Sequence, residues 1–255
     1  MPEQSRQDPK EDAGLPQGEA DDLDRRTLLR IEPEKALHIA GELRAFIADP
    51  DYPCVGAKSA LAKDSLEILV AHDLGSGWDD LRIHESLLQW SRDYERDPED
   101  LRSLAIVFAG PDDLDEVGFE QRMWERLQSL ADKDGWRGQS YDESVSSDPS
   151  DPHFSLSFGG QAYFVVGLHP GASRPARRFA HPTLVFNLHD QFERLREDGR
   201  YSKIRRTVLE RDLDLAGSLN PMLEEHGEGS EARQYSGREV SDEWVCPFID
   251  KRDPS

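Results

Sequence analysis

One cysteine, Cys54, stands in a sequence context that could activate a thiol. It follows Tyr52-Pro53 and directly precedes an apolar pattern that predicts a helix from Val55 to Ala71. The free N–H groups and the positive end of the dipole at a helix N-terminus stabilise a thiolate. Cys54 could therefore be a metal ligand or a nucleophile, and the alternative is a buried thiol without a chemical role.

A second group of residues lies in a basic loop that joins two predicted strands. The loop contains three arginines and two histidines, namely Arg174, Arg177, Arg178, His169 and His181. Guanidinium groups form paired hydrogen bonds with carboxylates and phosphates, so the loop predicts an anion-binding site. The alternative is a loop face whose arginines are simply solvated.

Two histidines, His181 and His189, flank the predicted strand that follows this loop, eight residues apart. This separation favours opposite ends or faces of the strand over one metal site. Taken alone, each is more often a hydrogen-bonded structural residue than a ligand. The sequence has no CxxC or Cys/His cluster, which argues against structural zinc, and no phosphate-binding loop, nucleophile elbow or HExxH motif.

The elements that must position these residues are strands and helices. Two apolar runs, 153–158 and 162–168, are separated by Gly159-Gly160-Gln161, and Gly-Gly between such runs is a strong hairpin signal. Further strands are predicted at 183–188 and at 104–109, the latter a continuous apolar run typical of a central strand. Helical periodicity is found at 34–49, 55–71, 78–94, 115–132, 190–198 and 201–213.

These elements predict an α+β fold, in which a small, mostly antiparallel β-sheet packs with several helices in a single domain of residues 31–250. Residues 1–30 are polar and acidic without periodic apolar positions, which predicts a disordered tail. The polar segment 224–248 contains Tyr235, Trp244 and Phe248 as anchors. We therefore expect that segment to be functional rather than a linker.

The composition limits the partners and the setting. The 255 residues carry a formal net charge of −21 and a pI near 4.7, which argues against nucleic acid or an anionic membrane as the main partner. Only seven of the 31 basic residues are lysines, a bias expected of a protein that works in concentrated salt, where screening reduces the repulsion between its many negative charges. The alternative is an ordinary acidic cytosolic protein. Without a leader-like start or an apolar run of ~20 residues, we expect a soluble, cytoplasmic protein. A disulfide between Cys54 and Cys246 stays open.

Longer strings are more specific than these single features. They occur in order along the chain: Tyr52-Pro53-Cys54-Val55-Gly56-Ala57, His169-Pro170 with Ser173-Arg174, Ala176-Arg177-Arg178-Phe179, Leu184-Val185-Phe186-Asn187 with His189 and Gln191-Phe192, Asn220-Pro221-Met222-Leu223, Ser230-Glu231-Ala232-Arg233-Gln234-Tyr235-Ser236-Gly237 and Trp244-Val245-Cys246-Pro247-Phe248. Over residues 35–248 the chain thereby resembles the YqcI/YcgG family. Members of that family studied in natural-product pathways are haem-dependent oxygenases that N-hydroxylate amines or guanidines such as arginine and its derivatives.

The resemblance implies haem b as cofactor, O2 and an external electron donor as co-reactants, and a small amine or guanidine as substrate. Cys54 would be the proximal thiolate and so the metal ligand, with Cys246 the weaker candidate. Thiolate ligation favours O–O cleavage at haem iron. A redox partner and a homodimer are further expectations, whereas nucleic acid and membrane are not expected partners.

The resemblance also assigns roles around the haem. Arginines 174, 177 and 178 would hold the propionates or a substrate carboxylate, and Asn187 belongs to the same cofactor-binding set. His169, His181 and His189 are candidates for a distal hydrogen bond, or for the proximal ligand if Cys54 is not it. Glu231, Gln234 and Tyr235 would place a cationic substrate. The alternatives are a haem-binding or haem-sensing module without turnover, and a haem-free protein whose arginine loop binds another anion.

Overall fold

The computed structural model describes residues 31–98, 101–222 and 229–252. Its helices are α2 (Pro33–Ala48), α3 (Val55–Ala62), α4 (Asp80–Arg96), α5 (Glu116–Trp136), α6 (His189–Glu197), α7 (Tyr201–Ala216) and α8 (Ala232–Tyr235), with 3-10 turns η1 (Gly77–Asp79) and η2 (Pro175–Arg177). Its strands are β1 (Leu66–Ala71), β2 (Ser103–Phe108), β3 (Leu156–Phe158), β4 (Gln161–Leu168) and β5 (Thr183–Leu188).

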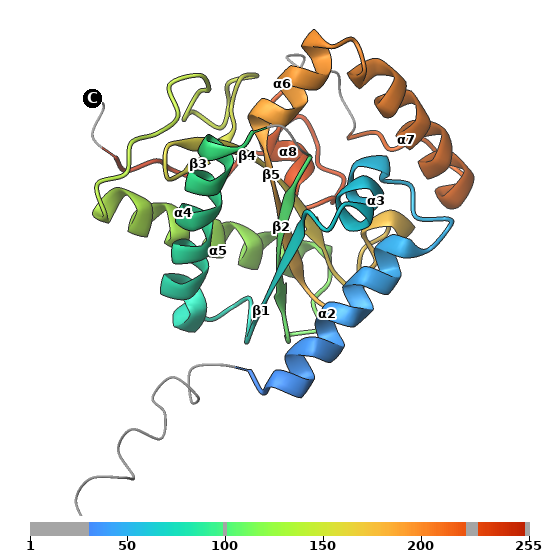
Figure 1. Cartoon of the computed structure of the whole chain (residues 1–255), viewed down its shortest axis with the longest axis horizontal. Helices are drawn as coiled ribbons and strands as arrows, with labels where there is room; N and C mark the ends of the chain where they lie inside the picture. Colours follow the sequence, from blue (N-terminus) through green and yellow to red (C-terminus); the bar gives the residue numbers. More distant parts are fainter. Residues whose placement is uncertain (1–30, 99–100, 223–228, 253–255) are drawn as a thin grey trace, which may run out of the picture.

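The described strands form one sheet in the order β1-β2-β5-β4-β3. Strands β2 and β5, β5 and β4, and β4 and β3 pair antiparallel, whereas β1 and β2 pair parallel. A parallel pair needs a crossover connection, and α4 lies in the one between β1 and β2. The predicted α+β fold with a small, mostly antiparallel sheet is therefore confirmed (Figure 1).

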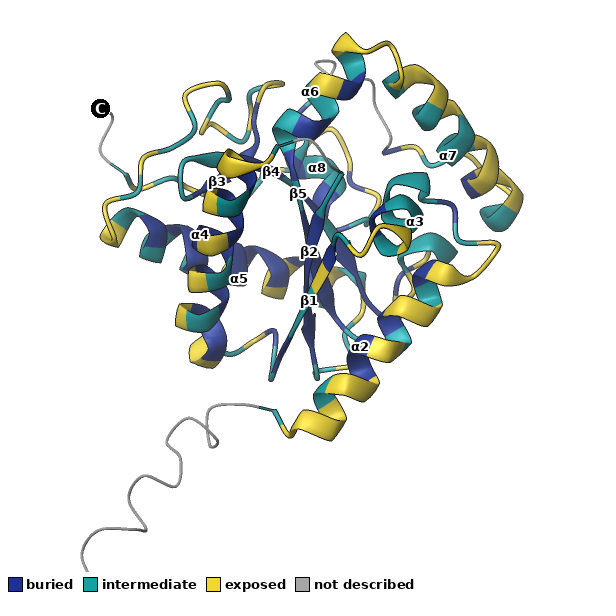
Figure 2. Cartoon of the chain, in the orientation of Figure 1, coloured by how far each residue is buried: buried dark blue, intermediate teal, exposed yellow. Residues whose placement is uncertain are grey.

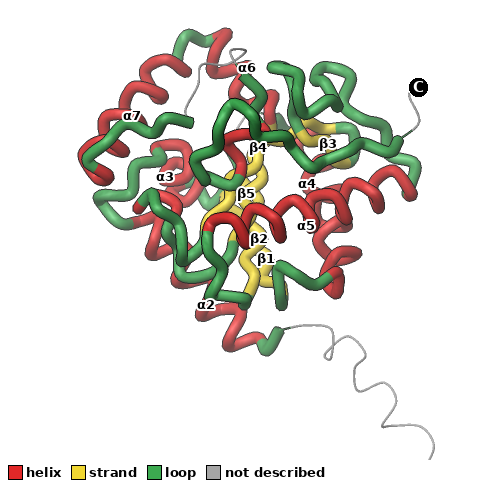
Figure 3. Tube along the Cα trace, turned by 180° about the vertical axis from the view of Figure 1, so that it is seen from behind, coloured by secondary structure: helices red, strands yellow, loops and turns green. Residues whose placement is uncertain are grey.

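Alternation along the strands divides the molecule into two layers around the sheet. In β2, Leu104 and Ile106 belong to the core under α4 and α5, whereas Ala105 and Val107 pack with residues of α2 and α3. Both faces of β2 are covered, so all of its residues are buried (Figure 2), which explains its continuous apolar run. Figures 1 and 3 show α4 and α5 on one side of the sheet and α2, α3 and α7 on the other.

The prediction of one helix from Val55 to Ala71 is wrong for the second half of that range. Helix α3 ends at Ala62, and Leu66–Ala71 is instead strand β1, which pairs with β2 along its whole length. Between them Asp64 adopts a φ of 57°, in the left-handed region where a helix cannot continue. A short apolar run fits either a helix or a strand, and the pairing with β2 decides between them.

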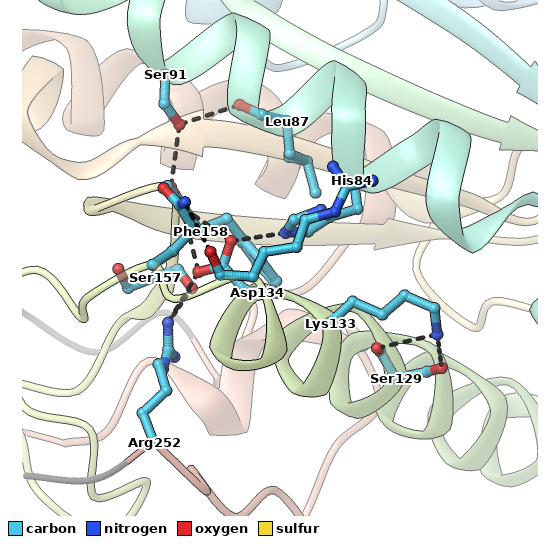
Figure 4. Close-up of polar contacts among 12 residues, drawn as sticks. His84, Leu87, Ser91, Ser129, Lys133, Asp134, Ser157, Phe158 and Arg252 are labelled. Carbon is cyan, nitrogen blue, oxygen red and sulfur yellow. Dashed lines mark hydrogen bonds and ion pairs between the residues drawn. The ribbon is translucent and has the colours of Figure 1, made fainter.

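The predicted hairpin is confirmed, and its turn is held by a hydrogen bond to Asp134 of helix α5. Gly159 and Gly160 adopt φ values of 60° and 75°, which favour glycine. Asp134 accepts the Gly159 N–H at 3.1 Å, and its Oδ1 lies 2.7 Å from His84 Nε2 (Figure 4). Arg252 Nη1 lies 3.0 Å from the same carboxylate, so the C-terminal segment is tied to this turn as well.

The segment 229–252 contains little regular structure but is firmly packed. Tyr235 and Phe248 are buried and lie against Trp124 of α5. Trp244 Nε1 donates to Glu120 at 2.8 Å, which confirms that the aromatic residues anchor this segment. The tail predicted for residues 1–30 lies outside the described residues. In the part of the chain that the structure describes, no helix is long and apolar enough to cross a membrane.

Candidate functional site

A cavity of about 320 Å³ lies between the sheet and helices α3, α6 and α7. Its floor is the sheet face opposite α4 and α5, with Ser103 and Ala105 of β2, Phe164 and Val166 of β4, and Val185 and Asn187 of β5. These residues alternate with the buried core residues, so the period of two along each strand selects them. The volume lies at the lower end of the ~300–1,000 Å³ typical of small-molecule sites.

Helix α7 forms the wall of the cavity that faces the sheet. It contributes Tyr201, Ile204, Val208 and Leu209 to the lining. Among the residues of α7 only Asp212 is buried. The apolar side chains of α7 are thus turned toward the cavity instead of a packed core, and a ligand with apolar surface would gain from covering them.

Cys54 lies on the cavity wall, at the N-cap of α3. Its Sγ accepts a hydrogen bond from the Ala57 N–H at 3.4 Å, so the predicted placement at a helix N-terminus is confirmed. Burial raises the pKa of the Cys54 thiol, while the N–H groups of Ala57 and Gly56 and the Arg177 guanidinium act in the opposite direction. A thiol in this setting becomes a thiolate when a metal ion binds it.

Cys246 lies elsewhere and forms no disulfide with Cys54. Both cysteines are free, and Cys246 packs against the core under α5. Burial raises the pKa of Cys246 to about 12, and the nearby carboxylate of Glu120 acts in the same direction. Of the two thiols, Cys54 is therefore the one with access to the cavity.

Arg177 is a cation whose charge acts on this thiol. Its Nη1 donates to the carbonyls of Gly167 (3.0 Å) and Tyr235 (3.2 Å), and its Nη2 donates to the carbonyl of Gln234 (3.2 Å). Burial lowers the pKa of Arg177, and Tyr52 and Cys54 act against that shift. Among the described residues these hydrogen bonds all go to backbone carbonyls and none to a carboxylate. Arg177 is thus an enclosed positive charge that would attract an anionic group.

The other two arginines of the loop have different surroundings. Arg174 also lines the cavity, but its guanidinium forms an ion pair with Asp212 of α7 and donates to the Ser218 carbonyl at 2.9 Å. Arg178 is exposed and donates to the carbonyls of Ala172 and Ser173, each at 2.8 Å. The structure therefore brings Arg174 and Arg177 to the cavity and leaves Arg178 outside its lining.

Glu231 brings a carboxylate to the same cavity. Its Oε2 accepts from Ser155 Oγ at 2.5 Å and lies 3.5 Å from the hydroxyl of Tyr235, and its Oε1 lies 3.7 Å from His189 Nδ1. Burial raises the pKa of Glu231, whereas His189, Ser155, Arg196 and Tyr235 lower it. Gln234 also lines the cavity, whereas Tyr235 is fully buried in the core.

The remaining predicted residues are separated from one another. His169 is buried against Phe119 of α5, with ring centroids 4.2 Å apart, and is absent from the cavity lining. His181 contacts Glu42 of α2, with Nε2 and Oε2 2.9 Å apart. Asn187 is on the cavity floor and its Oδ1 accepts from Ser103 Oγ at 2.7 Å. As predicted, His181 and His189 lie at opposite ends of one strand.

Several residues that line the cavity or contact its lining were not predicted from the sequence. Ser155 sits at the start of the hairpin and donates to Glu231, and Asp212 is the buried residue of α7. Arg102 and Arg196 line the wall from two separate elements. The apolar spacing of Ile204 and Val208 in 201–213 was the available signal that this helix has an inward face.

The fold and the site define an α+β protein with an apolar, arginine-walled cavity lined by one cysteine and two carboxylates, of which Asp212 is ion-paired with Arg174. Residues 43–249 match the YqcI/YcgG family, and the chain belongs to that family. No curated protein and no solved structure matches it.

Proposed function

We propose that the protein is a haem-dependent oxygenase that N-hydroxylates a small amine or guanidine. The observation that carries the proposal is the pairing of Cys54 with Arg177 on the wall of one apolar cavity. A thiol supplies an axial ligand to iron, and an enclosed guanidinium supplies a partner for a carboxylate.

The residues present fit a haem by the chemistry of the donor set. Among the described residues no group of three or more His, Cys, Asp or Glu could hold a bare metal ion, but haem iron needs only axial ligands from the protein. Cys54 would be that ligand, and Arg177 would hold a propionate, with Arg174 as second candidate. Bound haem supplies activation of O2 for transfer of one oxygen atom, with electrons from an external donor.

The carboxylate of Glu231 supports a cationic substrate. Two carboxylates line the cavity among several arginines, and Asp212 is ion-paired with Arg174, so Glu231 is the better candidate for binding a cation. An ammonium or guanidinium group would form a charge-assisted hydrogen bond with it, in a setting where burial strengthens the attraction. The arginines would repel the same cation, so Glu231 would determine where the substrate nitrogen lies.

The test is turnover of haem-loaded protein with a reductant, O2 and a panel of small amines and guanidines. We expect a product that gains one oxygen atom, with Glu231→Gln raising KM for cationic substrates. The matched control is Glu197→Gln, an exposed carboxylate of α6 outside the cavity lining. Haem bound without any substrate-dependent oxidation would instead support a haem-binding module without turnover.

A further inference from the structure

A continuous chain of polar contacts leads from the surface to the cavity wall. Glu193 Oε1 lies 3.1 Å from His189 Nε2, and His189 Nδ1 lies 3.1 Å from Ser155 Oγ. Ser155 Oγ donates to Glu231 Oε2 at 2.5 Å, and Glu231 lines the cavity. Each step is within the distance at which a proton can pass between neighbouring heavy atoms.

Exposure changes along this chain in the way that a path inward requires. The side chain of Glu193 is 41% exposed, that of His189 12%, Ser155 is fully buried, and that of Glu231 is 12% exposed. Glu193 and His189 are one turn apart on α6, whereas Ser155 and Glu231 come from the start of the hairpin and the segment before α8, so only tertiary packing brings these two to the helix.

The chemistry of the members suits proton transfer. Histidine changes charge near neutral pH and has a nitrogen facing each neighbour, while a hydroxyl both accepts and donates. The groups that face Glu231 are His189 and Arg196 of α6, Ser155, and Tyr235 of α8. Burial raises the pKa of Glu231 above the usual glutamate value, so the protonated form becomes accessible closer to neutral pH.

We propose that Glu193, His189, Ser155 and Glu231 form a proton path that delivers protons from solvent to a ligand in the cavity. Its use in catalysis rests on the proposed oxygenase function, because oxygen activation consumes protons. The path itself depends only on the contacts among these four side chains and not on the oxygenase function. Glu231 is the member that touches the ligand, and the other three position and reload it.

The protons balance at every step. In its protonated state Glu231 gives its carboxyl proton to the ligand and becomes the carboxylate that pairs with a cation, and it is then reloaded with the hydroxyl proton of Ser155. Ser155 takes the proton from His189 Nδ1, and one proton enters from solvent at His189 Nε2 by way of Glu193. One proton enters for each proton delivered, and no oxidant or reductant is needed.

The first measurement uses protein without haem, so that it is independent of the proposed function. Infrared titration should show a protonated-carboxyl band that is missing in Glu231→Gln. The band should titrate at higher pH in Ser155→Ala, because that change removes a hydrogen-bond donor to the ionised form. Absence of any band assignable to Glu231 across the folded pH range would overturn the path, since Glu231 would then hold no proton to give.

The second measurement uses haem-loaded protein in H2O and D2O. We expect Ser155→Ala to lower kcat about tenfold or more with KM nearly unchanged, and to increase the solvent isotope effect on kcat. Ser157→Ala is the matched control, because Ser157 is buried in the same strand region but accepts from the Asp142 N–H at 2.9 Å, away from the path. Wild-type kcat and isotope effect in Ser155→Ala would refute the path, whereas failure of the oxygenase proposal would appear as no turnover in the wild type.

Discussion

Replacement of Arg177 by Met should destabilise the protein, because it breaks the hydrogen bonds that tie the loop 169–182 to β4 and α8. Arg177→Met removes the donors to three carbonyls, those of Gly167, Tyr235 and Gln234. Hydrogen bonds from a charged group contribute about 1–3 kcal/mol each to stability. The net loss is smaller than their sum, because cavity water can hydrogen-bond to the carbonyls in place of the guanidinium. We therefore expect a loss of about 3 kcal/mol in the free energy of unfolding. For a chain of this size that corresponds to a Tm lower by roughly 6–12 °C.

Arg178→Met is the matched control in the same turn. Arg178 also donates to backbone carbonyls, at the shorter distance of 2.8 Å, but its side chain is exposed. Water replaces such bonds, so we expect a loss of about 0.5 kcal/mol or less. Urea denaturation followed by circular dichroism measures both variants. Equal losses in the two would refute the reasoning that enclosure, and not the number of hydrogen bonds, makes Arg177 special.

Three further predictions follow from the same structure. Burial raises the pKa of the Cys54 thiol, so this thiol in the folded protein should be alkylated at pH 7–8 more slowly than free cysteine, and faster as the pH rises. The rate is followed in the peptide that contains Cys54, and a rate equal to that of free cysteine would contradict the prediction. Burial lowers the pKa of His169, so the unfolded chain binds the extra proton and stability should fall as pH drops below ~6.5; His169→Phe should flatten that dependence between pH 7.5 and 5.5 in chemical denaturation. Gly167→Ala would place Cβ 2.7 Å from a ring carbon of Phe119 and should cost about 1–3 kcal/mol, whereas Gly41→Ala, with nothing within 4 Å, should not destabilise.

The parts of the fold that could be predicted were those with local signals. Gly159-Gly160 between apolar runs predicted the hairpin, because only the turn explains two adjacent glycines there. The run at 104–109 predicted an interior strand, because burial on both faces removes the alternation. The strand Leu66–Ala71 was missed, because its residues fit a helical period and only its partner β2 selects the extended form.

The site was predictable only where chemistry and local structure coincide. Cys54 satisfied both conditions, since the proline before it and the helix after it are visible in the sequence. The arginine loop was identified as a unit, but its three guanidinium groups point to three environments that spacing cannot distinguish. The meeting of Ser155 with Glu231, 76 residues later, depends on how the C-terminal segment packs, which no local pattern records.

The proposed oxygenase function requires that Cys54 bind haem iron in the cavity. The most direct measurement is the absorption spectrum of haem-loaded protein, reduced and exposed to CO, for wild type and Cys54→Ala, with Cys246→Ala as control. We expect a Soret band at the long wavelength typical of thiolate-bound haem, lost in Cys54→Ala and retained in Cys246→Ala. A band unchanged in Cys54→Ala, or no haem bound to folded wild-type protein, would contradict the claim.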